Sequence, residues 1–158
     1  MPVFNASTSG EGMRFAVVSS RYNDFITEKL VRGARECLLE NGVADADIDV
    51  YWCPGALEVP AVAARALECG RDDKPYDGIV CCGCVIRGET DHYTFVSTEA
   101  IRGVAELALL AEAAFGNAIL TVENTQQAIE RSGDRANNKG WEAASAALEV
   151  ANLFRRME

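Results

Sequence analysis

The sequence contains little of several residue types. Among its 158 residues are one histidine, four prolines and two tryptophans, and 15 basic residues stand against 24 acidic ones. The resulting net charge of −9 argues against DNA or RNA as a general partner, because proteins meet nucleic acid with basic surfaces. No uninterrupted run of about 18 apolar residues is present, which excludes a membrane-spanning helix of the usual kind.

Two phosphate-binding fingerprints are also absent. Neither G-x-x-x-x-G-K-[ST] nor G-x-G-x-x-G occurs, so the chain has no motif for a nucleoside triphosphate or a dinucleotide. The first residues, MPVFNASTSGEGMR, lack a basic region followed by an apolar core, which argues against a signal peptide. Their composition predicts a loose arm over residues 1–13, ahead of a single domain over residues 14–158.

The cysteines raise the question of a redox or metal site. Cys81 and Cys84 have the C-x-x-C spacing, but they stand inside DGIVCCGCVIRG, an apolar run typical of a buried strand. Alternation along a strand sends these two side chains to opposite faces. The cysteines are therefore interpreted as small packing residues in a reducing cytoplasm, and no metal site is expected.

Strand-like and helix-like segments alternate along the chain. Apolar, β-rich runs predict strands over residues 14–20, 47–53, 76–88 and 117–124, the third of them apolar on both faces like a central parallel strand. Helical periodicity predicts helices over residues 24–42, 58–70 and 91–114, with closing helices after residue 124. The alternation predicts an α/β fold, a three-layer αβα sandwich around a four-stranded parallel sheet. Ligands of such sheets bind beyond the carboxyl ends of the strands.

Several residues that could bind a ligand follow the ends of the first two predicted strands. Tyr22 is either an exposed loop aromatic or a flat platform for a heterocycle. In the segment CPGALEVP, Gly55 lets backbone N–H groups approach a ligand closely. Glu58 is either an ordinary acid at a helix start or an acceptor for ligand hydroxyl and amine groups.

The third strand is followed by RGETDH, which contains the single histidine, His92. Thr90 or Asp91 can cap the next helix, and the N–H groups of Glu89 and Thr90 are candidates to hold an anion such as phosphate. The charges of Glu89 and Asp91 oppose an anion unless both side chains point away. An imidazole exchanges protons near neutral pH, so His92 is the best single candidate for chemistry, although lone histidines are often packing or surface residues.

Two of the cations late in the chain are further candidates for a phosphate site, Arg131 in IERSG and Lys139 in NNKGW. A helix dipole alone favours an arginine near a helix end, which is the simpler interpretation of Arg131. A guanidinium is also the group that a phosphate site commonly uses.

Five segments carry a resemblance to a known family: SRYNDFITEKL, PGALEVP, GCVIRGETDH, ILTVENTQQA and ERSGDRANNKGWEAA. In this order and spacing they resemble the lumazine synthases, over residues 14–154, and VIRGxTxH is highly specific for that family. The resemblance implies a flavodoxin-like fold and a transferase of riboflavin biosynthesis. Its reaction joins 5-amino-6-(D-ribitylamino)uracil to 3,4-dihydroxy-2-butanone 4-phosphate and yields 6,7-dimethyl-8-ribityllumazine, without metal or organic cofactor.

Two other functions are alternatives to this one. A non-catalytic flavin- or lumazine-binding protein of the same fold predicts loss of the histidine or of the phosphate-binding groups, and both are present. A flavodoxin-like signalling or redox domain needs an acidic phosphorylation pocket or a Ser- and Thr-rich phosphate loop after the first strand. The segment SSRYND is a poor version of that loop.

The resemblance also implies roles for individual residues. Tyr22 corresponds to the aromatic residue that stacks on the pyrimidine, and His92 to the proton-transfer histidine. The family's residues that bind the ribityl chain and the ring correspond to Ala56, Leu57, Glu58, Cys84, Val85 and Ile86. Its phosphate-binding residues correspond to Glu89, Thr90, Arg131 and Lys139. Asn117 departs from the family, which commonly has a phenylalanine there that reaches the pyrimidine from a neighbouring subunit. Altered ring contacts are expected, without loss of the reaction.

Finally, the resemblance implies a homo-oligomer built from pentamers, with active sites at subunit interfaces and the N-terminal arm adding a strand to a neighbouring sheet. Pentamers pair into a decamer in some members and form an icosahedral 60-mer in others; the segment GDRANNKG carries no insertion that departs from the shell-forming pattern. The expected partners are the two small-molecule substrates, with riboflavin synthase as a further candidate and with no nucleic acid or membrane. A cytoplasmic location is expected.

Overall fold

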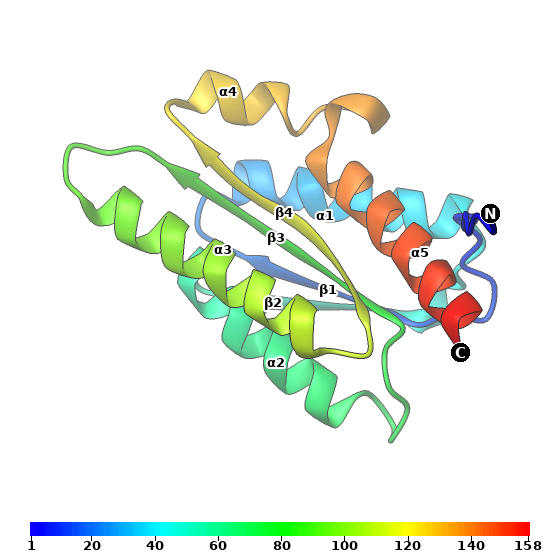
Figure 1. Ribbon diagram of the computed structural model, residues 1–158. Coiled ribbons are helices and arrows are strands. Elements are labelled where there is room, and N and C mark those ends of the chain that lie inside the picture. The colour runs from blue at the N-terminus through cyan, green and yellow to red at the C-terminus, as the bar shows by residue number, and fades with distance from the viewer.

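Four parallel strands form the central sheet in the computed structural model, which describes all 158 residues (Figure 1). Their order across the sheet is β2–β1–β3–β4, and every neighbouring pair is parallel. The α/β class and the four-stranded parallel sheet expected from the sequence are thereby confirmed. The strands are β1 (Phe15–Ser20), β2 (Ile48–Cys53), β3 (Gly78–Ile86) and β4 (Ala114–Val122).

The burial of each strand follows its place in the sheet. All six residues of β1 are buried, as are the first seven of β3, because both faces of these central strands are covered. Val17 of β1 pairs with Val50 of β2 on one side and with Val80 of β3 on the other. The edge strand β4 alternates instead, and Asn117 and Thr121 are its exposed positions.

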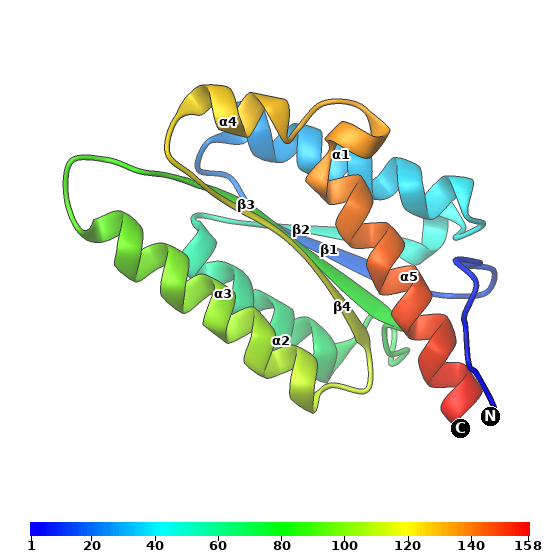
Figure 2. The ribbon, with the colours of Figure 1, turned by 45° about the horizontal axis from the view of Figure 1, so that its top comes forward.

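Two pairs of helices cover the sheet, which gives the three expected layers (Figures 1 and 2). On one face lie α1 (Asp24–Glu40) and α5 (Lys139–Met157); on the other lie α2 (Val59–Cys69) and α3 (His92–Leu110). The short helix α4 (Thr125–Glu130) follows β4 beyond the end of the sheet. Three short 3₁₀ turns complete the chain, η1 (Asp45–Asp47), η2 (Ala56–Glu58) and η3 (Arg135–Asn137).

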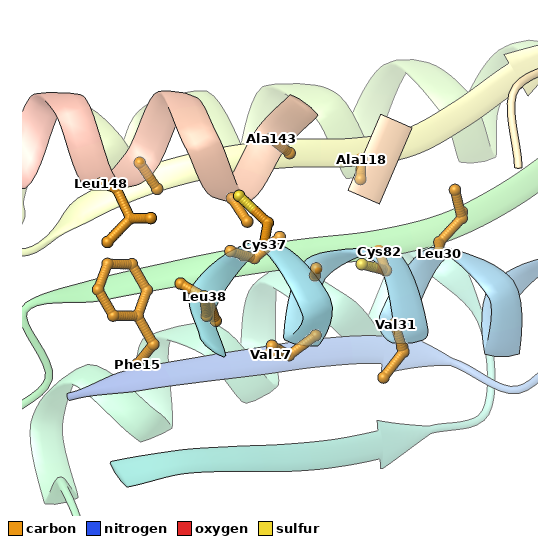
Figure 3. Packing of buried hydrophobic residues seen from close by; sticks show 14 of the residues in the cluster. Phe15, Val17, Leu30, Val31, Cys37, Leu38, Cys82, Ala118, Ala143 and Leu148 are labelled. Carbon is orange, nitrogen blue, oxygen red and sulfur yellow. The ribbon is translucent and has the colours of Figure 1, made fainter. Parts of the chain in front are cut away.

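A hydrophobic core fills each of the two interfaces between helices and sheet. The larger cluster, of 24 buried residues, lies under α1 and α5, and Figure 3 shows Phe15 and Val17 of the sheet packed there against Leu38 and Leu148. The second cluster, of 13 buried residues, lies under α2 and α3. Cys82 and Cys84 belong to the first cluster and Cys81 to the second. The predicted separation of Cys81 and Cys84 is thus confirmed, and all six cysteines are free.

The end of α3 and the start of β4 differ from the sequence-based expectation. The helix stops at Leu110 rather than at residue 114, and the strand begins at Ala114 rather than at residue 117. The segment LLAEAA consists of good helix formers, so periodicity alone gives no stop signal there. The pairing of β4 with β3 decides the boundary, because all nine residues of β3 find a partner from Gly78–Ala114 to Ile86–Val122.

Of the two capping candidates before α3, Thr90 Oγ1 accepts a hydrogen bond from His92 N at 3.3 Å, whereas the side chain of Asp91 accepts none. Asn23 precedes α1, and its side chain does not cap that helix. Asn23 has a left-handed backbone, with φ 63° and ψ 47°, and its side chain bonds elsewhere. None of the helices combines the length and apolar character that crossing a membrane requires.

The N-terminal arm has no helix or strand over its first ten residues and follows its own subunit. Gly10 N donates to Asn41 O at 2.7 Å, and Asn152 Nδ2 donates to Ser9 O at 2.7 Å. These bonds tie the arm to the end of α1 and to α5. Addition of the arm to a neighbouring sheet stays a prediction.

Candidate active site

A pocket of about 490 Å³ opens at the carboxyl end of the sheet. Three turns form it: those that follow β1, β2 and β3. Eight of its fifteen lining residues are hydrophobic, which suits a flat organic ligand held by a few polar groups. The lining residues are Tyr22, Asn23, Pro54, Gly55, Ala56, Leu57, Glu58, Cys84, Val85, Ile86, Gly88, Thr90, His92, Tyr93 and Val96.

The turn after β1 places Tyr22 at the mouth of this pocket. Tyr22 N donates to Pro54 O at 3.0 Å, which fixes the turn against the one after β2. Asn23 Nδ2 donates to Cys84 O at 2.9 Å, which ties the same turn to the end of β3. Tyr22 is 74% exposed, which leaves its ring accessible to a stacked heterocycle.

The turn after β2 supplies Ala56, Leu57 and Glu58 through the short turn η2. Glu58 N donates to Gly55 O at 3.2 Å, which folds the segment back on itself. A methyl group on Gly55 would lie 2.9 Å from Glu58 Oε2, so the absence of a side chain at residue 55 gives the carboxylate its place. No side chain of the protein donates a hydrogen bond to that carboxylate, which leaves it available as an acceptor.

The turn after β3 carries the residues of the VIRGxTxH motif. Cys84 is buried and Val85 and Ile86 are half-buried, so the backbone of this strand end forms the pocket floor. Thr90 and His92 follow in an exposed turn, where His92 N donates to Thr90 Oγ1 at 3.3 Å. The imidazole itself has no partner in the chain and opens into the pocket, where it can exchange protons with a ligand.

Four of the residues implicated by the sequence do not line the pocket. Glu89 lies in the turn before His92 and is not a lining residue, and Asn117 stands exposed on β4, where its Oδ1 accepts from Ile119 N at 3.2 Å. Arg131 Nη1 donates to Gln127 O at 3.0 Å, and Lys139 Nζ lies 2.8 Å from Glu142 Oε2. A backbone bond of 2.9 Å from Lys139 N to Arg131 O holds these two cations next to each other.

The charge inside the pocket is therefore incomplete for a phosphorylated ligand. Its lining includes one carboxylate, Glu58, and the imidazole of His92, but no lysine or arginine. Burial raises the pKa of Cys84 to about 11, so this thiol stays neutral and is a poor nucleophile at neutral pH. Burial first, and the nearby Glu58 carboxylate second, also raise the pKa of Cys53 beneath the pocket. No group of three or more histidine, cysteine or carboxylate side chains is arranged to hold a metal ion.

Sequence reasoning missed two kinds of pocket residue. Asn23 is one of them, and its bond to Cys84 O depends on a strand pairing that local sequence does not reveal. Tyr93 and Val96 also line the pocket, and Val96 follows Tyr93 by three residues and His92 by four, which are the spacings that bring side chains to one face of a helix. The spacing from His92 was visible in DHYTFV and would have identified Val96.

A second hollow, of about 760 Å³, lies at the opposite end of the sheet, between α2, α3 and the end of α5. Tyr76 and Asp77 are its polar members near β3, and both already have partners in the chain. It contains no histidine, so it offers less chemistry than the smaller pocket.

Comparison with known proteins gives one consistent family. The model described as 6,7-dimethyl-8-ribityllumazine synthase matches residues 12–155. A protein of that name from Clostridium kluyveri is 40% identical over 158 residues, which is the full length of both chains. Others of that name are 46% identical in Anaeromyxobacter dehalogenans, covering 98% of this chain and 93% of the relative, and 47% identical in Chlorobium phaeobacteroides, covering 92% and 91%.

Proposed function

Because the chain belongs to the 6,7-dimethyl-8-ribityllumazine synthase family, we propose that it condenses 5-amino-6-(D-ribitylamino)uracil with 3,4-dihydroxy-2-butanone 4-phosphate in riboflavin biosynthesis. The products are the lumazine, water and inorganic phosphate. One observation carries the proposal: Tyr22, Glu58 and His92 come from three separate turns and line one pocket of about 490 Å³.

The reaction needs two amines, a ketone and a leaving phosphate to be brought together. In the proposed mechanism the pyrimidine stacks on Tyr22, and its ribityl hydroxyls donate to the Glu58 carboxylate. The primary amine condenses with the ketone and one water leaves; phosphate is then eliminated, and the second nitrogen attacks the carbonyl group that remains, which closes the ring with loss of a second water. His92 gives and takes the protons of these steps, a contribution of typically about 10²–10⁴-fold. Alignment of the two substrates in one pocket supplies much of the remaining acceleration.

The phosphate requires positive charge that the pocket of one subunit lacks. Thr90 and the neighbouring backbone N–H groups provide hydrogen bonds, but the lining contains no lysine or arginine. Arg131 and Lys139 lie next to each other outside this pocket. We therefore propose that a second subunit supplies this pair of cations, and its Asn117, to complete the site. A homo-oligomer with active sites at its interfaces follows.

Mixing inactive variants tests the shared site. His92→Ala and Arg131→Ala are each expected to be strongly impaired, the second mainly through a higher KM for the butanone phosphate. Co-assembled in equal amounts, they restore wild-type residues at about one quarter of the interfaces if the two residues come from different subunits. Formation of the lumazine, followed by its absorbance and fluorescence, reports the recovery.

A matched control uses wild type mixed with the His92→Ala/Arg131→Ala double variant. About one quarter of the sites are active in that mixture if the site is shared, and about one half if each subunit has its own. If the first mixture recovers no activity and about one half of the sites in the control mixture are active, each subunit has its own site. This outcome would rule out the shared site and leave the proposed reaction in place. Absence of lumazine from the wild-type protein under varied pH and phosphate would overturn the proposed activity.

The proposed assembly and location follow chiefly from the family resemblance. We expect pentamers, alone or associated into a decamer or an icosahedral shell, with the N-terminal arm pairing with a free sheet edge of a neighbour; β2 and β4 both have such an edge. Riboflavin synthase is a candidate partner because it belongs to the same biosynthesis. Six free cysteines support a reducing compartment, the cytoplasm. Sedimentation of the native particle measures the assembly.

A further inference from the structure

The turn between β3 and α3, residues 88–91, is weakly attached to the rest of the protein. Thr94 N and Phe95 N donate to Asp91 O at 3.0 and 3.3 Å, and His92 N donates to Thr90 Oγ1; these bonds stay within the turn and the start of α3. All four residues of the turn are exposed, and a methyl group on Gly88 would touch nothing within 4 Å. Figures 1 and 2 both show the turn projecting from its end of the molecule.

Arg87, the residue immediately before this turn, makes three contacts that span it. Its backbone N donates to Val122 O at 2.9 Å and its Nε donates to Glu123 Oε2 at 2.8 Å, so it is bound to the end of β4. Its guanidinium carbon lies 4.3 Å from the ring centroid of Tyr93, within the range of a cation–π contact. Tyr93 belongs to the first turn of α3 and lines the pocket beside His92. Arg87 therefore connects both ends of the turn to a third element.

Glu123, the partner of Arg87, is itself held in place. Its backbone N donates to Gln127 Oε1 at 2.8 Å, and Gln127 N donates to Asn124 Oδ1 at 2.9 Å, which caps α4. The Arg87–Glu123 pair is half exposed, with side-chain exposures of 46% and 59%. Exposed ion pairs contribute little to global stability, so the geometry of this pair matters more than its energy.

We infer that Arg87 is a positioning residue, which holds the turn and the first residues of α3 in the geometry that binds the phosphorylated substrate and presents His92. The inference rests on the proposed function. Arg87 does not line the pocket, and its charge already faces Glu123 and Tyr93, so it acts through the turn rather than on the ligand. A turn with no tertiary bonds of its own loses its alignment when this contact is removed, and alignment errors of about 1 Å can cost about 100-fold in rate.

Arg87→Met removes the charge and the hydrogen bond but keeps an unbranched side chain. We expect the KM for the butanone phosphate to rise about tenfold and kcat to fall, with the KM for the pyrimidine substrate within about twofold of wild type. Arg87→Lys, which keeps the charge, recovers part of the loss. Arg65→Met is the matched control: Arg65 is also exposed, pairs with Glu68 at 3.1 Å within α2, lies outside the active-site pocket, and should leave all three constants unchanged.

Hydrogen exchange provides a readout that does not depend on turnover. The amides that make hydrogen bonds at the two ends of the turn, those of Arg87, Thr94 and Phe95, should exchange about tenfold faster in Arg87→Met than in wild type, while the amides of β3, and all of these amides in Arg65→Met, do not change. Unchanged exchange at these three amides, or faster exchange with unaltered kinetic constants, overturns the inference while the wild-type enzyme still forms lumazine. A wild-type protein that forms no lumazine overturns the proposed function instead, whatever the exchange shows.

Discussion

At the amino end of the sheet, Tyr51, Tyr76 and Asp49 form a closed hydrogen-bonded chain, whereas at the carboxyl end the side chains of Glu58 and His92 have no partner in the protein. Tyr76 Oη donates to Asp49 Oδ2 at 2.6 Å and lies 2.6 Å from Tyr51 Oη, which leaves Tyr51 as the donor of the second bond. Burial, and then the bonds to Asp49 and Tyr51, raise the pKa of Tyr76.

Arginines complete the closed network at the amino end. Arg71 pairs with Asp49, and Arg14 Nη1 donates to the carbonyl oxygens of Arg71 and Lys74 at 3.1 Å. Similar residue types therefore serve two purposes in one sheet. Where polar groups satisfy one another they fix the chain, and where they are left unpaired around a pocket they are available to a ligand. The following substitutions separate the two purposes.

The largest effect is expected from His92→Ala at the open end. Loss of proton transfer should lower kcat by about 10²–10⁴-fold, because no other side chain in the pocket exchanges protons as readily near neutral pH. The imidazole is exposed and unpaired, so the urea midpoint should not change. Binding of a product analogue, measured by titration calorimetry, should be largely spared. A collapse of that affinity would make His92 a binding residue instead.

Asp49→Ala at the closed end should produce the reverse pattern. It leaves the Tyr76 hydroxyl and the Arg71 guanidinium without their acceptor, and we expect the free energy of unfolding to fall by about 2–3 kcal/mol. Urea denaturation measures the loss, and Tyr51→Phe, which removes only the last bond of the chain, should cost about 1 kcal/mol. The kcat of the folded protein should stay at the wild-type value; a large loss of activity would mean that the two ends are coupled.

Alkaline pH should lower the stability of the folded protein even in the absence of a ligand. Burial raises the pKa of Cys37 and of Cys84 to about 11 and that of Cys81 to about 12, against 9.0 for a free thiol. Between pH 9 and 11 the unfolded chain releases these protons and the folded chain keeps them, so stability present below pH 9 is lost as the pH rises. The slope is up to about 1.4 kcal/mol per pH unit for each group.

Urea midpoints in the presence of a reductant at pH 8, 9, 10 and 11 measure this slope. Cys81→Ala serves as the control: it lowers stability at every pH but removes one titrating group, so its slope should be shallower. Equal slopes in the two proteins would show that Cys81 does not contribute.

The smallest effect is expected from Asn117→Phe, which introduces the aromatic residue common in the family. An aromatic ring at the proposed subunit interface would add about 0.5–1.5 kcal/mol of stacking, which lowers the KM for the pyrimidine roughly two- to tenfold. Thr121→Phe, at the other exposed position of β4, is the control for added hydrophobic surface. An identical gain in both variants would remove residue 117 from the site.

Much of the fold was predictable because the apolar positions of the sequence coincide with the buried positions of the structure. The continuous apolar run GIVCCGCVI predicts a central strand and forms β3. The helix α2 ends at its cap Gly70, which has φ 59°, as the predicted range 58–70 implies. The start of β4 was missed because it depends on pairing with β3 over its full length, which is not encoded in the local preference of LLAEAA. Local propensity yields to tertiary pairing at such boundaries.

The candidate site was predictable in part for the same reason. Parallel strands bring their carboxyl ends together, so Tyr22, Glu58 and His92, which are far apart in sequence, could be expected at one edge of the sheet. Two contacts could not be predicted from the sequence: the hydrogen bond from Asn23 to Cys84 O and the cation–π contact of Arg87 with Tyr93. Neither contact has a local signature, because each joins separate elements.

Gly55 illustrates how a residue without chemistry can constrain the chemistry of its neighbour. Every single-nucleotide change of a glycine codon that yields another amino acid adds at least a Cβ, and at residue 55 that atom would lie 2.9 Å from Glu58 Oε2. In Gly55→Ala this atom displaces the carboxylate, while every charged and hydrogen-bonding side chain of the pocket keeps its identity. Because Oε2 is the far end of a flexible side chain, the substitution is expected to alter ligand recognition more than folding.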